Sequence, residues 1–338
     1  MRALVWHGPR SMTLEHIAEP VPAPDDVIIR VEAVGICGSE LSGYVGENSL
    51  RKPPLIMGHE FCGRVEHAPL GAPLARGQRV AVNPLVSCGK CARCRAGLHN
   101  LCATREIIGV HRPGAFAELV AVPAGNCFAV PAEMGSAAAA FAEPLACGVR
   151  AVELAHLVPG GSVLLLGCGA IGLCVLAAAR HAGAAVLAVT DTNSARLRTG
   201  RTWGATHLLD GQSDPAAAVR ALTGGAGVDV AIDAVGQAAT RQAAVRSVRR
   251  GGRVVLVGLH EAETTLPIND IVRNETQITG SFAYTRKTFA QALALLNAGI
   301  IDTAGAWLEE RPLEAGPNSF EQLLRGDVSA AKIMLVPK

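Results

Sequence analysis

The chain has 338 residues, enough for two domains of ordinary size. Hydrophobic residues make up 49% of it and charged residues 18%, so it can bury large cores and is not a disordered chain. A formal net charge of +2 argues against a broad nucleic-acid-binding surface, and no apolar run approaches the roughly 20 residues of a membrane-spanning helix. The N-terminus lacks the long apolar segment of a signal peptide, so we expect a cytoplasmic protein.

Short runs rich in β-branched residues predict strands in the first part of the chain, where glycine and proline clusters separate them. These runs lie at 2–6, 27–34, 79–82 and 116–122. The chain is therefore expected to be β-rich from its N-terminus to about residue 140.

From about residue 150 the pattern changes to strands that alternate with helices. Strands are expected at 162–166, 185–190, 206–209, 229–233, 253–257, 277–282 and 332–336, and helices at 170–181, from 194 onward and at 288–298. Such alternation predicts a parallel sheet with right-handed crossover connections.

Four of the ten cysteines lie in one short segment, with two, two and seven residues between them: Cys88, Cys91, Cys94 and Cys102. In a reducing compartment, clustered cysteines indicate a metal site before disulfides. Short gaps let thiolates converge on one tetrahedral ion. An iron–sulfur cluster is the alternative, but the ferredoxin spacing closes with three residues and a proline, which this segment lacks. Four thiolates form a closed shell, so we expect a structural zinc ion.

A glycine-rich turn follows the strand expected at 162–166 and opens the helix expected at 170–181. Its residues match the pattern G-x-G-x-x-G: Gly167, Cys168, Gly169, Ala170, Ile171 and Gly172. In this setting the first glycine permits the tight turn, the second admits a pyrophosphate, and the third allows close helix packing. The helix N-terminus then faces the phosphate, and the pattern predicts a dinucleotide site.

Asp191 ends the next expected strand, about 20 residues after the turn, where dinucleotide-binding folds place an acidic residue. Its carboxylate can accept hydrogen bonds from a ribose hydroxyl and would repel a 2′-phosphate, which favours NAD over NADP. Arg196 is a nearby basic residue and leaves room for NADP. The structural alternative is that Asp191 only caps the following helix.

A second, catalytic metal site is suggested by Cys37 and His59, with Glu60 and Glu143 as candidate third ligands. A catalytic zinc ion needs about three protein ligands and one open position, and cysteine, histidine and carboxylate all suit it. Spacing alone does not establish this site. Cys37 can equally be a buried thiol, and Glu143 a carboxylate at a helix start before Pro144.

Taken together, these motifs resemble the zinc-dependent medium-chain alcohol dehydrogenases, in the polyol branch that includes sorbitol, galactitol-phosphate and threonine dehydrogenases. The matches span nearly the whole chain in the family's order. They are 35–39 (Gly-Ile-Cys-Gly-Ser), 58–60 (Gly-His-Glu), the four-cysteine segment, 143–146 (Glu-Pro-Leu-Ala), the glycine-rich turn and 280–284 (Gly-Ser-Phe-Ala-Tyr).

The resemblance implies an α/β protein with a GroES-like β-rich catalytic domain and a Rossmann domain that has a doubly wound parallel sheet. On this basis the catalytic domain covers 1–148 with a zinc lobe at 84–105, the Rossmann domain 149–283, and a return to the catalytic domain 284–338. The family is usually dimeric or tetrameric, which implies a homo-oligomer here.

The resemblance also implies roles for single residues. Cys37 and His59 are expected to ligate the catalytic zinc, with either Glu60 or Glu143 as the third ligand, and Ser39 is expected to relay the alcohol proton. The residues expected beside the nicotinamide are Val257, Gly258 and Leu259 on one side and Ser281, Phe282 and Ala283 on the other.

The chain departs from the family pattern at three places. Glu40 replaces the aspartate that usually orients the zinc-binding histidine, so that hydrogen bond needs testing. Ser42 replaces a histidine that often ends the proton relay, and the proton then leaves through Ser42 or water. Ala283 stands where sorbitol dehydrogenases tend to have arginine, which weakens a sorbitol assignment.

Two basic residues, Arg286 and Lys287, follow closely in the sequence. They are either an anion-recognition site for the substrate or a solvated helix start.

The sequence therefore predicts reversible transfer of a hydride between NAD and a secondary alcohol of a polyol or sugar alcohol, with or without a phosphate group. Threonine or a cyclitol is the alternative substrate. A rival of another class is a nucleotide-binding sensor without catalysis, but that reading predicts lost zinc ligands, and all four candidates are present. A zinc-ribbon module that binds nucleic acid has only Arg93 and Arg95 as local support. We expect neither a nucleic-acid nor a membrane partner.

Overall fold

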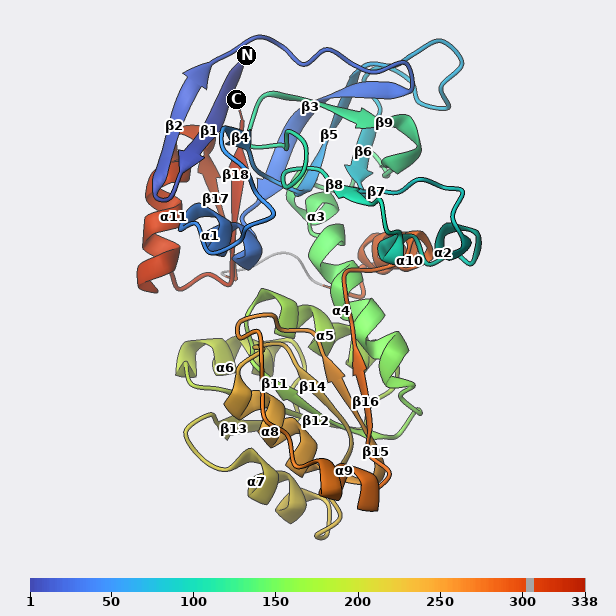
Figure 1. Ribbon diagram of the computed structural model, residues 1–338, viewed down its shortest axis with the longest axis vertical. Helices are drawn as coiled ribbons and strands as arrows, with labels where there is room; N and C mark the ends of the chain where they lie inside the picture. Colours follow the sequence, from blue (N-terminus) through green and yellow to red (C-terminus); the bar gives the residue numbers. More distant parts are fainter. Residues whose placement is uncertain (302–306, 338) are drawn as a thin grey trace. The chain divides into compact units, whose positions relative to one another are not determined.

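The computed structural model describes residues 1–301 and 307–337. The chain divides into two compact units (Figure 1). Unit 1 comprises Met1–Glu143 together with Thr285–Lys338, and unit 2 comprises Pro144–Tyr284. Unit 1 is thus assembled from two separated segments of the chain, whereas unit 2 is one continuous stretch.

Unit 1 is mainly β-structure. Its strands are β1 (Arg2–Gly8), β2 (Ser11–His16), β3 (Asp26–Gly35), β4 (Leu55–Ile56), β5 (Glu60–His67), β6 (Arg79–Val82), β7 (Leu85–Val86), β8 (Glu106–Ile107), β9 (Leu119–Pro123), β10 (Cys127–Ala129), β17 (Leu308–Pro312) and β18 (Lys332–Val336). Its helices are α1 (Gly38–Tyr44), α2 (Ala92–Arg95), α3 (Ser136–Ala140), α10 (Arg286–Asn297) and α11 (Gly316–Arg325), with short 3-10 turns η1 (His99–Leu101), η2 (Ala124–Asn126) and η3 (Leu313–Ala315).

The largest sheet of unit 1 has the strand order β10-β6-β5-β3-β18-β17, and β9 also pairs with β3. A smaller sheet has the order β2-β1-β4, and β7 pairs with β8. In the large sheet β18 runs antiparallel to β3, with Met334 opposite Gly35, so residues from the two segments of unit 1 share one sheet. In the core of the same unit, the rings of Tyr44 and Phe116 pack against Phe320 of α11 at centroid distances of 5.1 and 5.8 Å.

Unit 2 contains alternating strands and helices (Figure 1). Helix α4 (Ala142–Ala155) leads into it, and the remaining elements are β11 (Ser162–Leu166), α5 (Ala170–His181), β12 (Val186–Asp191), α6 (Ser194–Thr202), β13 (His207–Asp210), α7 (Pro215–Leu222), β14 (Val228–Asp233), α8 (Ala238–Ser247), β15 (Val248–Leu256), α9 (Ile268–Arg273) and β16 (Gln277–Gly280).

The six strands of unit 2 are all parallel and lie in the order β13-β12-β11-β14-β15-β16. This order is that of a doubly wound Rossmann sheet. The central strand β11 is an apolar run, Ser-Val-Leu-Leu-Leu, and four of its five residues are buried because helices cover both faces of such a sheet. The parallel sheet predicted from the alternation of strands and helices is confirmed.

Most expected elements occur with small shifts of their ends, but three differ more. The strand expected at 116–122 begins only at Leu119, because the backbone of Phe116 bonds to Leu4 and Met57 instead. The strand expected at 253–257 begins at Val248, where Val248 pairs with Val228 before a bulge. The strand expected at 277–282 ends at Gly280. None of the described helices is both long and apolar enough to cross a membrane.

Candidate active site

The pairing of β3 with β5 brings three candidate ligands together in unit 1. Gly35 at the end of β3 lies opposite Glu60 at the start of β5, so Cys37, two residues beyond β3, lies beside His59. The ligand atoms of Cys37, His59 and Glu60 all lie within 4.8 Å of one another. His59 is 7% exposed and Glu60 only 1%. A thiol, an imidazole and a carboxylate gathered in a buried place form the donor set of a zinc ion, so these residues fit that metal.

Glu40 fixes the orientation of His59, despite being one methylene longer than the usual aspartate. Its Oε1 lies 2.8 Å from His59 Nδ1 and accepts a 2.8 Å hydrogen bond from the Gly58 backbone N–H. Its Oε2 accepts a 3.0 Å hydrogen bond from the Cys37 backbone N–H, which caps α1. With Nδ1 engaged in this way, Nε2 is the ring nitrogen left to bind a metal.

The charges in this cluster reinforce one another. Burial alone would raise the pKa of Glu40, but His59 and then Arg51 outweigh it and lower that pKa, so Glu40 is a carboxylate at neutral pH. Burial alone would lower the pKa of His59, but the Glu40 carboxylate and the Cys37 sulfur raise it well above its ordinary value. The surroundings of His59 therefore favour positive charge at the ring.

We expect Glu40→Gln to weaken metal binding, because the neutral amide keeps a hydrogen-bond acceptor near His59 and loses the negative charge. Loss of such a supporting carboxylate lowers zinc affinity about 10- to 100-fold. The measurement is the rate at which a chelator removes zinc from the site of Cys37, His59 and Glu60, followed by metal analysis of the protein. Glu47→Gln, at an exposed position seven residues further along, is the matched control. Equal zinc retention in both variants would contradict the role of Glu40.

Lys332 at the start of β18 forms a buried ion pair with Glu60, and its ammonium also donates a 3.0 Å hydrogen bond to the Ile36 carbonyl. Lys332 is 3% exposed. Burial would lower the pKa of Lys332, but the carboxylate of Glu60 outweighs burial and raises it above its ordinary value. Glu60 thus has two possible partners, the metal and the Lys332 ammonium, and the ion pair limits how much of its charge is available to the metal.

Glu143 is not part of the group of ligand atoms formed by Cys37, His59 and Glu60. It lies in the first turn of α4 and is 7% exposed, and among the described residues the cluster of ligand atoms within 4.8 Å contains Glu60 but not Glu143. The structure therefore brings together three of the four residues expected at the catalytic metal.

Ser39 lies in the first turn of α1, two residues after Cys37, and is solvent-exposed. The Ser42 hydroxyl donates a 3.1 Å hydrogen bond to the Ser39 carbonyl oxygen. The hydrogen of Ser42 is therefore directed at the backbone and away from the Ser39 hydroxyl.

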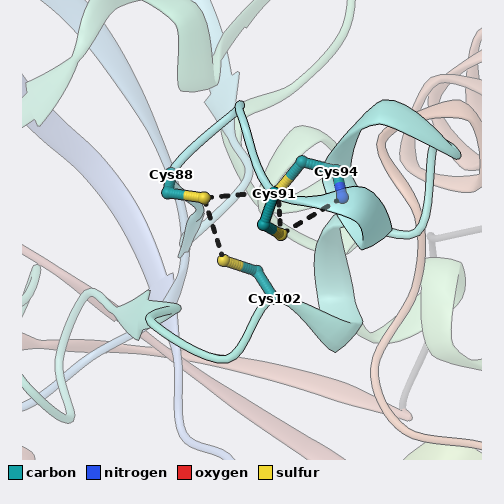
Figure 2. Close-up of side chains that lie close together, drawn as sticks. All are labelled: Cys88, Cys91, Cys94 and Cys102. Carbon is teal, nitrogen blue, oxygen red and sulfur yellow. Dashed lines mark hydrogen bonds between the residues drawn. The ribbon is translucent and has the colours of Figure 1, made fainter.

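The four clustered cysteines converge in the loop that contains α2 and η1 (Figure 2). The Sγ distances are 3.9 Å for Cys88–Cys94, 3.5 Å for Cys91–Cys94 and 3.6 Å for Cys88–Cys102. Sulfur atoms bound about 2.3 Å from one tetrahedral ion lie roughly 3.8 Å apart, so these spacings fit zinc without rearrangement. All four thiols are free of disulfides.

The surroundings of this cluster favour thiolates at some positions. Hydrogen bonds from the Cys88 backbone and from Thr104 lower the pKa of Cys102 to about 6. Burial raises the pKa of Cys94 to about 11. A metal binds the thiolate and not the thiol, so a closed shell of four sulfur ligands overcomes the cost of ionising the buried Cys94.

In unit 2 the expected cofactor residues all follow the carboxyl ends of parallel strands. The glycine-rich turn follows β11, Asp191 ends β12, Val257 follows β15 and Ser281 follows β16. Carboxyl ends of parallel strands meet at one edge of the sheet, where open α/β sheets bind their ligands. The topology thus brings residues from four strands to one edge.

The turn after β11 is shaped to admit a phosphate group. A Cβ built on Gly172 would lie 2.1 Å from the Gly167 carbonyl oxygen, so only glycine lets α5 approach the turn this closely. At Gly169, the N-cap of α5, a Cβ would meet no atom within 4 Å, and the space beside the helix N-terminus is open. That arrangement fits the pyrophosphate of a dinucleotide.

Asp191 is not a helix cap, because Asn193 caps α6 by accepting hydrogen bonds from Ala195 and Arg196. The Asp191 carboxylate instead accepts 2.8 Å hydrogen bonds from the backbone N–H groups of Cys168 and Asn193. Each carboxylate oxygen keeps a further lone pair for a ribose hydroxyl. The Arg196 side chain is exposed.

We expect Asp191→Ala to raise the KM for NAD and to improve the use of NADP relative to NAD. A hydrogen bond to a charged group contributes about 1.5–3 kcal/mol, which corresponds to roughly 10- to 100-fold in binding. Initial rates with both cofactors measure the change. Asp210→Asn on the neighbouring strand β13, opposite Asp191, is the control. An unchanged ratio of NADP to NAD use would contradict a ribose contact at Asp191.

The loops after β15 and β16 are held by main-chain hydrogen bonds. The backbone N–H groups of Val257 and Gly258 both donate to the Asp233 carbonyl, at 2.9 and 3.0 Å, and that of Ser281 donates to the Leu256 carbonyl at 2.8 Å.

The side chains of these loops differ in exposure. Leu259 is 81% exposed and Phe282 is 37% exposed. Ala283 has a positive φ of 48°. The Ser281 hydroxyl is buried and has no hydrogen-bond partner among the described residues, which fits a polar group supplied by a cofactor.

The side chain of Arg286 is engaged in contacts within unit 1. It is the first residue of α10, its guanidinium lies 4.6 Å from the centre of the Phe128 ring, and it donates a hydrogen bond to the Gly125 carbonyl. Lys287 is exposed on the same helix. Of the two interpretations of this pair, the arrangement favours a helix start over anion recognition.

Two residues of the site were not anticipated from sequence. Lys332 is a single charge at the head of an apolar strand, Lys-Ile-Met-Leu-Val, and a buried partner could have been suspected from that pattern. Arg51, buried beside α1, gave no signal because it lies in an irregular segment among prolines.

Comparison with known proteins agrees with this geometry. Residues 23–132 match the alcohol dehydrogenase GroES-like domain family, and residues 170–298 match the zinc-binding dehydrogenase family. The chain is 34% identical to a sorbitol dehydrogenase of Bacillus subtilis (strain 168), over 100% of this chain and 97% of that protein. It is 36% identical to an L-galactonate-5-dehydrogenase of Escherichia coli (strain K12), over 92% and 91%.

Among solved structures, the alcohol dehydrogenase TADH from Thermus sp. ATN1 superimposes with a TM-score of 0.93 at 30% identity, covering 100% of both chains. The identities and the coverage establish the family as well as the fold. With its GroES-like and Rossmann domains and its two cysteine-containing groups of residues that could hold a metal ion, this chain belongs to the zinc-dependent medium-chain alcohol dehydrogenases and is an oxidoreductase.

Proposed function

We propose that the protein oxidises a secondary alcohol of a polyol or sugar alcohol with NAD, and reduces the corresponding ketone in reverse. The single observation that supports this most strongly is the buried group of Cys37, His59 and Glu60, with Ser39 two residues away. Relatives named for sorbitol and for L-galactonate point to a polyhydroxylated carbon chain. In the forward reaction a hydride leaves the carbinol carbon and reduces NAD, and the hydroxyl proton goes to solvent.

We assign Cys37, His59 and Glu60 as the protein ligands of a catalytic zinc ion, and Cys88, Cys91, Cys94 and Cys102 as those of a structural one. When bound at the first site, zinc supplies Lewis acidity that makes a coordinated hydroxyl more acidic. Glu143 remains an alternative third ligand in our assignment. Glu40 holds the His59 ring in place, and Lys332 holds the Glu60 carboxylate.

Ser39 is the proposed proton relay, because its hydroxyl is the exposed side-chain oxygen of α1 nearest in sequence to Cys37. A hydroxyl can accept one proton while it donates another, which a relay requires. Since the hydrogen of Ser42 points to the Ser39 carbonyl, we propose that the proton passes from Ser39 to water.

We assign the cofactor to the edge of the parallel sheet in unit 2. The residues of this site are Gly167, Gly169, Ala170, Ile171, Gly172, Asp191, Arg196, Val257, Gly258, Leu259, Ser281, Phe282 and Ala283. The carboxylate of Asp191 favours NAD, whose ribose carries a hydroxyl where NADP carries a phosphate. NAD supplies the hydride acceptor, and the residues of this edge bind and orient it.

We further propose that residues 1–148 and 284–338 form the catalytic domain and 149–283 the NAD domain. The chain is expected to form a homodimer or homotetramer in the cytoplasm, where reducing conditions keep clustered thiols available to metal. Light scattering coupled to gel filtration tests the oligomer.

The activity is tested by following reduced nicotinamide across a panel of polyols, polyol phosphates, cyclitols and threonine, with NAD and NADP in parallel. We expect turnover of one polyol group with NAD and its loss after treatment with a zinc chelator. A preference for threonine or a cyclitol would move the substrate assignment within the family. If protein that contains two zinc ions per chain turns over no compound of the panel, this result would contradict the polyol assignment.

A further inference from the structure

Arg51 is a buried cation beside the proposed relay serine. Its side chain is 4% exposed. One terminal nitrogen donates a 2.9 Å hydrogen bond to the Ser39 carbonyl oxygen, and the other lies 3.4 Å from Ser39 Oγ in donor geometry. The planar guanidinium therefore contacts both polar oxygens of one residue, twelve positions earlier in the chain.

Helix α1 leaves space for this side chain. A Cβ built on Gly43 would lie 2.6 Å from Arg51 Cδ and 3.1 Å from its Nε. Any larger residue at this position would displace the arginine from Ser39. Glycine is less favourable than alanine within a helix, and at this position it is the residue that leaves room for Arg51.

The charge of Arg51 is not neutralised by a direct ion pair with any described residue. The oxygens of Glu40, the buried carboxylate nearby, are occupied by the N–H groups of Cys37 and Gly58 and by His59 Nδ1. Nε of Arg51 is buried and has no hydrogen-bond partner among the described residues. Burying a cation without a direct anionic partner is costly, and Arg51 interacts with the nearby Glu40 carboxylate only through space.

We propose that Arg51 is a positioning residue for the proton relay: its guanidinium holds Ser39 Oγ and keeps a permanent positive charge beside the substrate oxygen that loses its proton. This inference rests on the relay role proposed for Ser39. Arginine occupies one lone pair of Oγ and leaves one lone pair and the O–H for exchange with the substrate and water.

The positive charge of the Arg51 guanidinium affects proton transfer by polarising the Ser39 hydroxyl. The free lone pair of Oγ accepts the substrate proton, and a donor that polarises Oγ makes the Ser39 O–H a stronger donor toward water, while the positive charge stabilises the negative charge that develops on the substrate oxygen. A guanidinium offers only N–H donors and no acceptor lone pair, so Arg51 cannot take the proton itself. The proton therefore continues from Ser39 to water.

A double-mutant cycle tests the proposal, with kcat measured for the wild type, Ser39→Ala, Arg51→Gln and the double variant. We expect Arg51→Gln to lower kcat about 10- to 100-fold in the wild-type background and less than about 3-fold in the Ser39→Ala background. In the single variant the acid limb of the kcat–pH profile should move to higher pH, because the developing negative charge loses its stabilising cation. Arg51→Lys, which keeps the charge but not the two-pronged contact, should be intermediate.

Lys52→Gln is the control, because it removes the adjacent exposed cation. Equal effects of Arg51→Gln in both backgrounds, or an unchanged pH profile, would overturn the proposal and leave Arg51 a structural residue. If Arg51→Gln does not fold, the same cycle with Arg51→Lys decides the question. A wild-type enzyme that turns over no alcohol would instead refute the proposed function, and this outcome is seen before any variant is made.

Discussion

Cys37→Ser should abolish alcohol oxidation while NADH binding persists. Cys37 is one of three ligand atoms in a buried group, and serine at that place is a poor zinc ligand. Loss of the metal removes Lewis acidity that contributes several kcal/mol, so kcat should fall by about a thousandfold or more. Cofactor binding should be retained, because the residues assigned to NAD lie in the other unit.

Metal analysis, NADH titration and initial rates on one preparation measure this result. The variant should hold one zinc ion per chain where the wild type holds two. Cys127→Ala removes another buried thiol of unit 1 that belongs to neither cysteine cluster, and it should keep both metals and full activity. Undiminished turnover by Cys37→Ser would refute the catalytic assignment, and would leave open a role for the metal that is not catalytic.

Cys94→Ser should release the structural metal and unfold its loop. The segment between Cys88 and Cys102 contains only α2, of four residues, and η1, of three, and helices this short have no stability of their own. Cys94 is 4% exposed, and its thiolate is stabilised by metal against the burial that raises its pKa to about 11. Because metal binding supplies the folding energy of such loops, the midpoint of thermal unfolding should fall by roughly 5–10 °C.

Limited proteolysis followed by mass spectrometry locates the effect, since new cleavage sites should appear between residues 84 and 105. His99→Ala, a substitution in the same loop at a residue outside the metal cluster, is the control and should remain resistant. Resistance of Cys94→Ser to protease, with both zinc ions retained, would show that this cluster is not a metal site.

Much of the architecture could be predicted from sequence because its signals are local. The apolar run of β11, the turn at Gly167 and the helix that follows are contiguous, and periodicity and glycine positions define them. The four clustered cysteines likewise fall within one loop.

What escaped prediction depends on contacts between distant segments. Glu60 and Lys332 come together only because β3 lies between β5 and β18, and nothing near either residue specifies that order. Whether Glu40 could reach His59 was also undecidable from residue type, since one methylene matters only once the backbone positions are known. The contact between Arg51 and the Ser39 carbonyl gave no sequence signal either, because Arg51 lies in an irregular segment whose path no periodic pattern defines.

The two-segment construction of unit 1 has a consequence for biosynthesis. Unit 2 is complete once Tyr284 has been made, and it can fold on the ribosome as a continuous domain. The strand that brings Lys332 to Glu60 is synthesised 296 residues after Ile36, with which Lys332 also bonds. Until then the large sheet lacks β18, and Glu60 has no buried cation to pair with. The pairing of β18 with β3 and the ion pair between Lys332 and Glu60 are therefore among the last contacts of unit 1 to form, whereas the cysteine loop at 88–102 is complete long before β18 is synthesised.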